Sequence, residues 1–180
     1  IMGDPTAQTM ARFFVFHLLQ AASMNNIRLG LSASIPARAL SGIEYNGHVF
    51  WDTEIYMLPF FAHVYPGIAR SLLQYRHDRL DQARSNARAA GCKGAKFPWE
   101  SAGTGLEVCP KILPLPDGGT MRWKGGELEI HINADVPFAC WQYYLASGDT
   151  KFWHGPALDI LVETARYWVS RARPCRRNGT

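Results

Sequence analysis

The 180-residue chain has little of what marks several common classes of protein. Its four cysteines (Cys92, Cys109, Cys140 and Cys175) form no C-x-x-C pair, and no Cys/His cluster has the spacing of zinc ligands. We therefore expect neither a disulfide framework nor a metal site. No run of 18 apolar residues occurs, so the sequence predicts no membrane span. Internal repeats and low-complexity segments are also absent from the sequence.

Acidic residues are missing from the last ten positions. Residues 171–180 contain four arginines and no acid, whereas residues 1–170 carry 15 basic and 15 acidic side chains. The formal net charge of +4 therefore belongs to the tail, and the body is neutral. Nucleic-acid binding needs basic residues clustered on one face. The sequence thus predicts no nucleic-acid partner, and it predicts that residues 171–180 form a solvated tail outside the domain of residues 1–170.

Apolar residues make up 47% of the chain, enough for a sizeable core, and their spacing is mainly helical. The first expected helix is apolar nearly all round, which is typical of a helix buried on most sides. The third has an arginine-rich face and an apolar face, and Gly91 suits its carboxyl end. The sequence predicts helices over residues 7–23, 52–63, 66–90, 133–147 and 152–169.

The remaining stretch, residues 91–132, is long, irregular and rich in glycine. Alternation of Leu128, Ile130 and Ile132 predicts a short strand within residues 123–132. Trp141 and Trp168 have helical spacing and are predicted to pack in the core. Because apolar helices alternate with helices that have a charged face, we expect an all-α fold of inner and outer helix layers.

Two indole–carboxylate pairs are the most informative feature of the chain. Trp51–Asp52 lies in GHVFWDTEI and Trp99–Glu100 lies in FPWES. An indole packs on the C–H face of a sugar ring, and a carboxylate accepts hydrogen bonds from the sugar hydroxyls. The pairs predict a carbohydrate site in which both converge on one hollow. The alternative is a helical scaffold in which these aromatic residues only pack.

Several segments resemble, in order, the central catalytic domain of glycoside hydrolase family 65. The resemblance spans about residues 7–170 and implies the first five helices of a twelve-helix (α/α)6 barrel, with a long irregular loop insertion. The segments are IPAR (35–38), GHVFWDTEIYMLP (47–59), GAKFPWESA (94–102), HINAD (131–135) and WQYYLASGD (141–149).

The resemblance also implies an activity and a site. Members of this family cleave α-glucosidic bonds with inversion, by hydrolysis or by phosphorolysis. Trp51 and Asp52 match the pair that holds the glucosyl ring, Trp99 and Glu100 match a second pair at the same pocket, and His131 lies where the acceptor subsite is shaped. These five are the predicted substrate-binding residues. The implied substrate is an α-glucoside such as maltose, trehalose or kojibiose; no cofactor or metal is expected, and inorganic phosphate would be a co-substrate only of a phosphorylase.

Inverting cleavage also needs a protonated carboxyl group on the leaving oxygen. In the family this acid belongs to a Gly-Pro-Asp-Glu-Tyr-like motif after the fifth helix, which this sequence does not contain, so the catalytic acid is expected downstream. Glu54, one turn from Trp51, is an alternative donor, although a structural hydrogen bond fits it as well. The stretch 107–110 (EVCP) is similar to hydrolytic members.

The expected partners, besides the α-glucoside, are the rest of the barrel and, in a full-length protein, a second copy in a homodimer. Cytoplasmic localisation is favoured. An inactive sugar-binding fragment is the alternative function.

Overall fold

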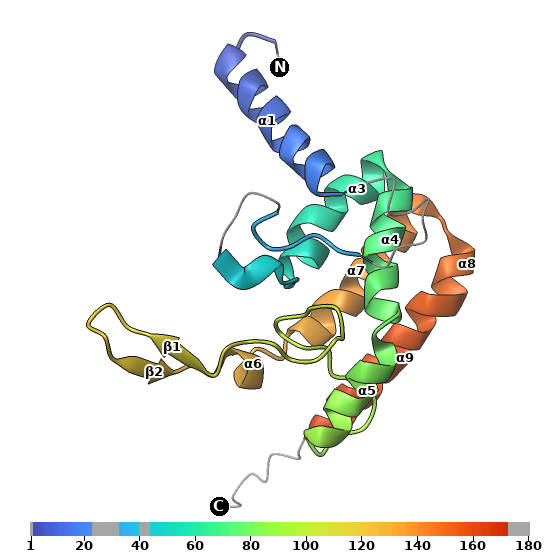
Figure 1. Ribbon diagram of the computed structural model, residues 1–180. Coiled ribbons are helices and arrows are strands. Elements are labelled where there is room, and N and C mark those ends of the chain that lie inside the picture. The colour runs from blue at the N-terminus through green and yellow to red at the C-terminus, as the bar shows by residue number, and fades with distance from the viewer. Residues whose placement is uncertain (1, 23–32, 40–43, 173–180) are drawn as a thin grey trace, which may run out of the picture.

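The computed structural model describes residues 2–22, 33–39 and 44–172; most of the predicted tail, residues 173–180, lies outside this range. The described chain is mainly helical with one two-stranded hairpin (Figure 1), which confirms the predicted all-α class. The elements are α1 (Pro5–Ala21), the turn η1 (Glu44–Gly47), the π turn η2 (Thr53–Met57), α3 (Leu58–Val64), α4 (Pro66–His77), α5 (Leu80–Ala89), β1 (Ile112–Pro114), β2 (Thr120–Arg122), α6 (Gly125–Leu128), α7 (Ile132–Ser147), α8 (Thr150–Phe152), the π turn η3 (Trp153–Ala157) and α9 (Leu158–Arg171).

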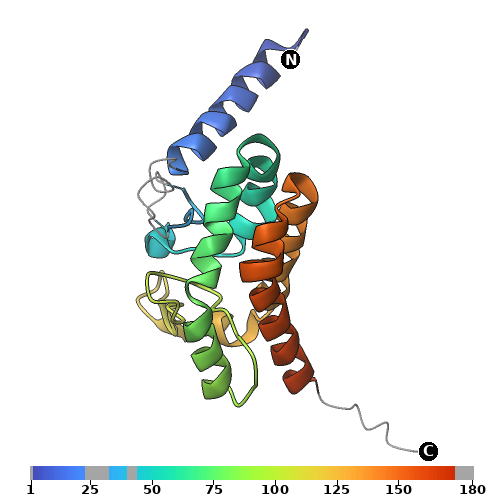
Figure 2. The ribbon, with the colours of Figure 1, turned by 90° about the vertical axis from the view of Figure 1, so that its right-hand side faces the viewer.

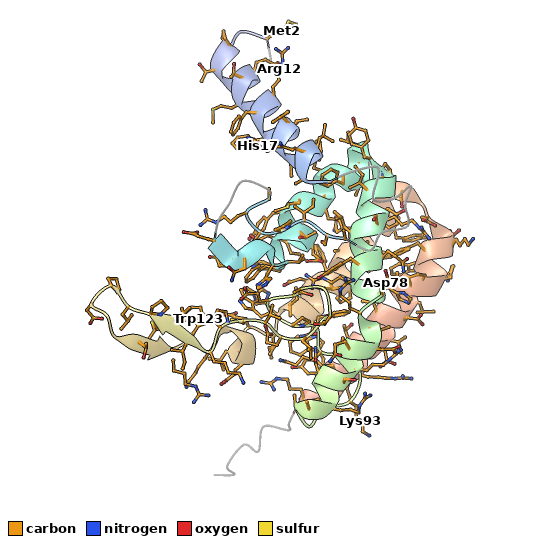
Figure 3. The ribbon with its side chains drawn as sticks, viewed as in Figure 1. Met2, Arg12, His17, Asp78, Lys93 and Trp123 are labelled. Atoms are coloured by element: carbon orange, nitrogen blue, oxygen red, sulfur yellow. The ribbon has the colours of Figure 1, made fainter. Side chains whose placement is uncertain are left out.

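Helix α1 begins where Asp4 accepts a hydrogen bond from the Ala7 amide at 2.9 Å, with Pro5 in the first turn. The prediction that this helix is buried on most sides is wrong for the described chain. Helix α1 contains no buried residue, and Phe13 and Phe16 are 57% and 60% exposed. Figures 1 and 2 show the helix standing away from the body, and in Figure 3 its labelled Arg12 and His17 are clear of the other elements. Only its carboxyl end packs on the described core, through Leu18, Leu19 and Ala21.

The core lies where α3, α4, α7 and α9 meet. Helix α7 packs against α3, α4 and α9, and in Figure 2 the α4–α5 pair runs beside the α8–α9 pair. Burial of apolar side chains at this junction removes their surface from water, which is the main force holding the helices together. The largest apolar side chains that are nearly inaccessible to solvent include Phe61, Leu73, Phe97, Ile132, Val136, Phe152 and Ile160.

The single helix predicted over residues 66–90 is two helices. Helix α4 ends at His77 and α5 starts at Leu80, because the Arg79 amide bonds to the Arg76 carbonyl at 3.1 Å and so forms a tighter turn. The Arg79 guanidinium then donates to the Tyr75 carbonyl at 2.9 Å. The guanidinium N–H thus takes the place of the Arg79 amide, which would donate to this carbonyl in a continuous α-helix. Gly91 ends α5 with a φ of 70°, as predicted.

Proline explains why two predicted helices begin with π turns. Pro59 and Pro156 have no amide hydrogen, so the α-helical hydrogen-bond ladder cannot continue through them. The Leu58 amide instead bonds to the Thr53 carbonyl, and the Leu158 amide reaches the Trp153 carbonyl. The first of these π turns lies immediately after Trp51 and Asp52.

The strand predicted within residues 123–132 is also wrong. The described hairpin lies earlier, at β1 and β2, with Ile112 opposite Arg122, and its turn is set by Gly118 at a φ of 84°. The alternation of Leu128, Ile130 and Ile132 instead marks the end of α6 and the start of α7. Figure 3 shows the labelled Trp123 at the base of the hairpin.

The two predicted core tryptophans differ in burial. Trp141 is 42% exposed and packs on the Trp153 ring at a centroid distance of 5.3 Å, so its assignment to the core is wrong. Trp168 is half-buried, and its indole N–H donates to the Asn133 carbonyl at 3.3 Å.

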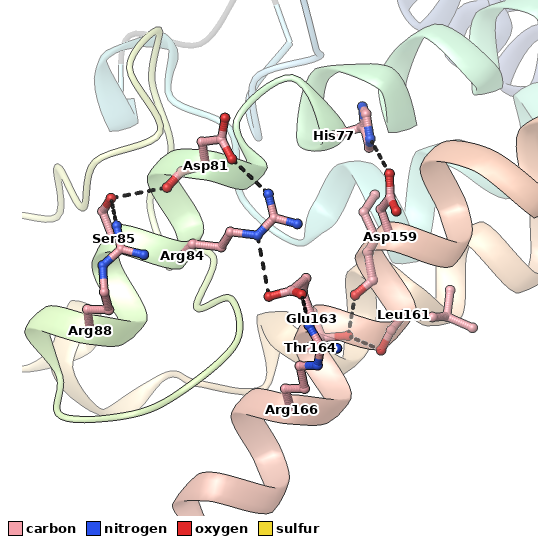
Figure 4. Close-up of polar contacts among 11 residues, drawn as sticks. His77, Asp81, Arg84, Ser85, Arg88, Asp159, Leu161, Glu163, Thr164 and Arg166 are labelled. Carbon is pink, nitrogen blue, oxygen red and sulfur yellow. Dashed lines mark hydrogen bonds and ion pairs between the residues drawn. The ribbon is translucent and has the colours of Figure 1, made fainter.

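Polar contacts connect the outer faces of the helices (Figure 4). Arg84 on α5 donates to Asp81 at 2.7 Å and lies 3.4 Å from Glu163 on α9, and His77 lies 3.2 Å from Asp159. The exposed Arg84–Asp81 pair contributes little stability, whereas Glu163 is buried and its contact with Arg84 joins α5 to α9.

Candidate functional site

A backbone bridge joins the two segments that carry the indole–carboxylate pairs. The Val49 amide donates to the Ser101 carbonyl at 2.8 Å, and the Ser101 amide donates to the Val49 carbonyl at 2.9 Å. Trp51 follows the first of these residues by two positions, and Glu100 directly precedes the second. The bridge therefore brings together two pairs that are far apart in sequence.

Both pairs line one cavity. Its volume is about 1020 Å3, and its wall includes Trp51, Asp52, Trp99 and Glu100. This volume is at the upper end of the range for small-molecule sites and leaves room for more than one sugar ring. The convergence expected from the sequence is therefore present in the structure. Tyr45, Phe50, Leu113 and Trp123 make the wall strongly aromatic and apolar.

His131 lies against both indoles. Its ring centroid is 4.7 Å from that of Trp51 and 5.2 Å from that of Trp99, with steep interplanar angles of 82° and 67°. Its Nδ1 lies 2.5 Å from a carboxylate oxygen of Asp135, one turn along α7. His131 contacts the two aromatic side chains of the site and is not among the residues that line the cavity.

The two carboxylates of the pairs have different surroundings. Burial raises the pKa of Asp52 above its ordinary value of 3.8; a backbone hydrogen bond offsets part of this rise, and the charge of Glu54 adds to it. Glu100 is almost fully buried, and its Oε1 lies 2.6 Å from Nδ1 of His48. A buried carboxylate with a fixed partner is a preorganised acceptor for a ligand hydroxyl.

Glu54 is occupied by a structural partner. Its two carboxylate oxygens accept hydrogen bonds from Nε and Nη2 of Arg76 at 2.7 and 2.9 Å, and Arg76 also donates to the Phe50 carbonyl at 3.2 Å. Burial alone would lower the pKa of Arg76, but the charge and hydrogen bonds of Glu54 raise it. Both oxygens of the Glu54 carboxylate are held by the buried Arg76 guanidinium, and Glu54 is not among the residues that line the cavity, so the alternative of Glu54 as proton donor does not fit the structure.

Glu107 is a residue of the site that the sequence analysis noted only as part of a similar stretch. Its carboxylate accepts hydrogen bonds from three backbone amides, those of Trp99 at 2.7 Å, Glu100 at 3.0 Å and Cys109 at 3.2 Å. Asn133 fixes the same loop from the other side, because its Oδ1 accepts from the Phe97 amide at 2.6 Å. Neither role has a signal in the sequence, since both side chains bond to main-chain atoms.

Two further properties concern only the described residues. They include no group of three or more His, Cys, Asp or Glu side chains placed to hold a metal ion. Their helices are all too short or too polar to cross a membrane.

The sequence matches the family model of the glycosyl hydrolase family 65 central catalytic domain over residues 12–180, and the chain therefore belongs to this family. A kojibiose phosphorylase from Caldanaerobacter subterraneus subsp. tengcongensis is 48% identical over 171 residues, which are 95% of this chain and 22% of that protein. A kojibiose hydrolase from Flavobacterium johnsoniae is 42% identical over 171 residues, 95% of this chain and 23% of that protein.

A solved structure is also similar. It is a candidate kojibiose phosphorylase from the human microbiome, with a TM-score of 0.79 at 26% identity, covering 95% of this chain and 21% of that one. The mainly helical fold and this similarity agree with the expected partial helical barrel. The chain spans about a fifth of the length of the relatives that it matches.

Proposed function

We propose that the cavity binds the glucosyl ring of an α-glucoside, and that kojibiose is the substrate of the protein to which this chain contributes. The observation that carries the proposal is the position of two indole–carboxylate pairs on one cavity wall. Trp51 and Trp99 supply aromatic faces for the sugar, while Asp52 and Glu100 accept hydrogen bonds from its hydroxyls. We choose kojibiose because two relatives, 48% and 42% identical to the chain, are a kojibiose phosphorylase and a kojibiose hydrolase.

We favour phosphorolysis over hydrolysis, with inorganic phosphate as co-substrate, because the relative at 48% identity is a phosphorylase and the relative at 42% is a hydrolase. The proposal assigns no proton donor among the described residues. Asp52 and Glu100 are assigned to sugar hydroxyls, and Glu54 is paired with Arg76. We therefore expect the 180-residue chain, mixed with kojibiose and phosphate, to release no β-glucose 1-phosphate. Release of this product would place the donor within the chain.

We propose further that additional helices of a barrel cover this part of the fold, and the exposed apolar side chains support this. Three helices carry several of them each, and solvent exposure of so many large apolar side chains is unfavourable. They include Phe13, Phe14 and Phe16 on α1, Phe138, Trp141 and Leu145 on α7, and Leu158 and Val169 on α9.

Calorimetric titration with kojibiose tests the binding step. We expect the Asp52→Asn variant to lose about tenfold or more in affinity, because hydrogen bonds to a charged group contribute roughly 1.5–3 kcal/mol. Asp81→Asn is the matched control, since Asp81 is exposed on α5 and is not among the cavity residues. Equal affinity of the Asp52→Asn variant and the unaltered chain would remove Asp52 from the site.

A further inference from the structure

The loop that presents Trp99 and Glu100 to the cavity has no regular secondary structure of its own. It lies between α5 and β1, and isolated β-bridges pair Ser101 with Val49 on one side and with Glu107 on the other. The Val108 amide also donates to the Glu100 carbonyl at 3.2 Å. Among the described contacts, however, no backbone carbonyl accepts from the amides of Trp99 and Glu100, so these two amides depend on a side chain.

The Glu107 side chain provides that contact. One carboxylate oxygen accepts from the Trp99 amide at 2.7 Å, and the other accepts from the amides of Glu100 and Cys109 at 3.0 and 3.2 Å. Glu107 is half-buried and is not among the residues that line the cavity. Its carboxylate therefore bonds to the backbone of the binding residues and does not face the cavity.

The chain also leaves space for this carboxylate. A Cβ atom at Gly126, in α6, would lie 2.8 Å from Cδ and 2.9 Å from Cγ of Glu107. Carbon atoms cannot approach this closely without displacement, so the position requires glycine or a shift of the glutamate side chain. The short helix α6 thus packs against the Glu107 side chain at Gly126, on which the carboxylate depends for its position beside the loop.

The number of donors explains why the residue is a carboxylate. The two oxygens of a carboxylate group offer about four acceptor sites and can satisfy three amides, whereas the glutamine side chain has one acceptor oxygen and a donor in place of the other. We propose that Glu107 is a positioning residue, which holds Trp99 and Glu100 in the orientation that binds the sugar. This inference rests on the proposed function for its effect on affinity, but its effect on the loop is independent of any sugar.

The test uses Glu107→Gln in the 180-residue chain, with hydrogen exchange of individual amides, kojibiose affinity and melting temperature as three readouts. We expect the amides of Trp99, Glu100 and Cys109 to exchange at least tenfold faster while the amides of α9 keep their rates. Kojibiose affinity should fall about tenfold. The matched control is Glu127→Gln, which removes a carboxylate that pairs with exposed Arg122 at 2.8 Å and is not among the cavity residues.

Gly126→Ala is a second route to the same result, since its methyl group displaces the Glu107 carboxylate without changing its chemistry. Unchanged exchange at the three amides in both variants would overturn the inference. An affinity loss accompanied by faster exchange throughout α9 would also overturn it, because that pattern means general destabilisation. If the unaltered chain fails to bind kojibiose, the proposed function fails, whereas the exchange measurement still decides whether Glu107 fixes the loop.

Discussion

Val49 and Ser101 exchange two backbone hydrogen bonds, of 2.8 and 2.9 Å, across 52 positions of sequence. The same segments also meet through side chains, because His48 lies 2.6 Å from Glu100. This bridge fixes the distance between the two indole–carboxylate pairs. The sugar site depends on it, since neither pair alone encloses a ring.

Breaking the bridge should weaken sugar binding. Val49→Pro removes the amide that donates to the Ser101 carbonyl, and we expect kojibiose affinity to fall at least tenfold, with a loss of about 1–3 kcal/mol in the free energy of unfolding. Ser101→Ala is the control: it removes the hydroxyl bonded to Tyr75 at 2.9 Å but keeps both backbone bonds. The prediction fails if the two variants bind kojibiose equally well.

The buried Glu54–Arg76 pair should matter for stability rather than for sugar binding. Replacing Arg76 by Met leaves the Glu54 carboxylate buried without its partner, which costs about 3–5 kcal/mol of unfolding free energy. Adding Glu54→Gln removes the uncompensated charge and should recover part of that loss. Urea denaturation of the single and double variants measures the coupling. Additive losses in the double variant would show that the two side chains do not act as a pair.

Two glycines with nearly the same backbone angle should respond differently to alanine. Gly91 has a φ of 70° and open space where a methyl group would lie, whereas at Gly94, with a φ of 72°, a Cβ would lie 2.1 Å from the Glu163 carbonyl oxygen on α9. We expect Gly91→Ala to cost about 1–2 kcal/mol of stability from backbone strain alone. Gly94→Ala should cost a further ~1–3 kcal/mol because the loop must move away from α9. Equal denaturation midpoints for the two variants would contradict this close contact.

Asp52 should make stability depend on pH. Burial raises its pKa in the folded chain above 3.8, so the folded chain binds this proton more tightly than the unfolded chain does. The resulting contribution is complete below about pH 3.8, and it is lost as the pH rises through the raised folded-state pKa. Asparagine carries no charge, so Asp52→Asn should be more stable than the unaltered chain at pH 7, while binding kojibiose less well.

The measurement is the urea midpoint of both proteins between pH 4 and pH 7. We expect the difference between them to narrow toward the acid end of this range. A constant difference across the range would mean that the charge of Asp52 does not destabilise the fold.

The sequence predicted both the helical class and the convergence of the two indole–carboxylate pairs on one cavity, but on different grounds. Helices leave a local periodic signal, which is why the helix at α7 was found almost to its bounds. The junction of Trp51–Asp52 with Trp99–Glu100 has no local signal, and it followed from the chemistry of the pairs and from the family resemblance. The structure then supplied its cause, the Val49–Ser101 bridge.

The errors arose where tertiary contacts override periodicity. The break between α4 and α5 depends on Arg79 reaching the Tyr75 carbonyl, and the apolar pattern runs across that break without interruption. The strand predicted near Leu128 failed because alternating residues can also end one helix and start the next. Glu107 was not predicted as a positioning residue because its partners are backbone amides, which are the same in every sequence.

The most direct test of the sugar site follows the indole N–H signals of a nitrogen-15-labelled chain during titration with kojibiose. Trp51 and Trp99 line the cavity, while Trp153 and Trp168 are not among its residues and serve as internal references. We predict that the Trp51 and Trp99 signals shift together with one dissociation constant, and that the two reference signals stay in place. A shift of only one of the Trp51 and Trp99 signals, or of neither, would contradict a single site built from both pairs.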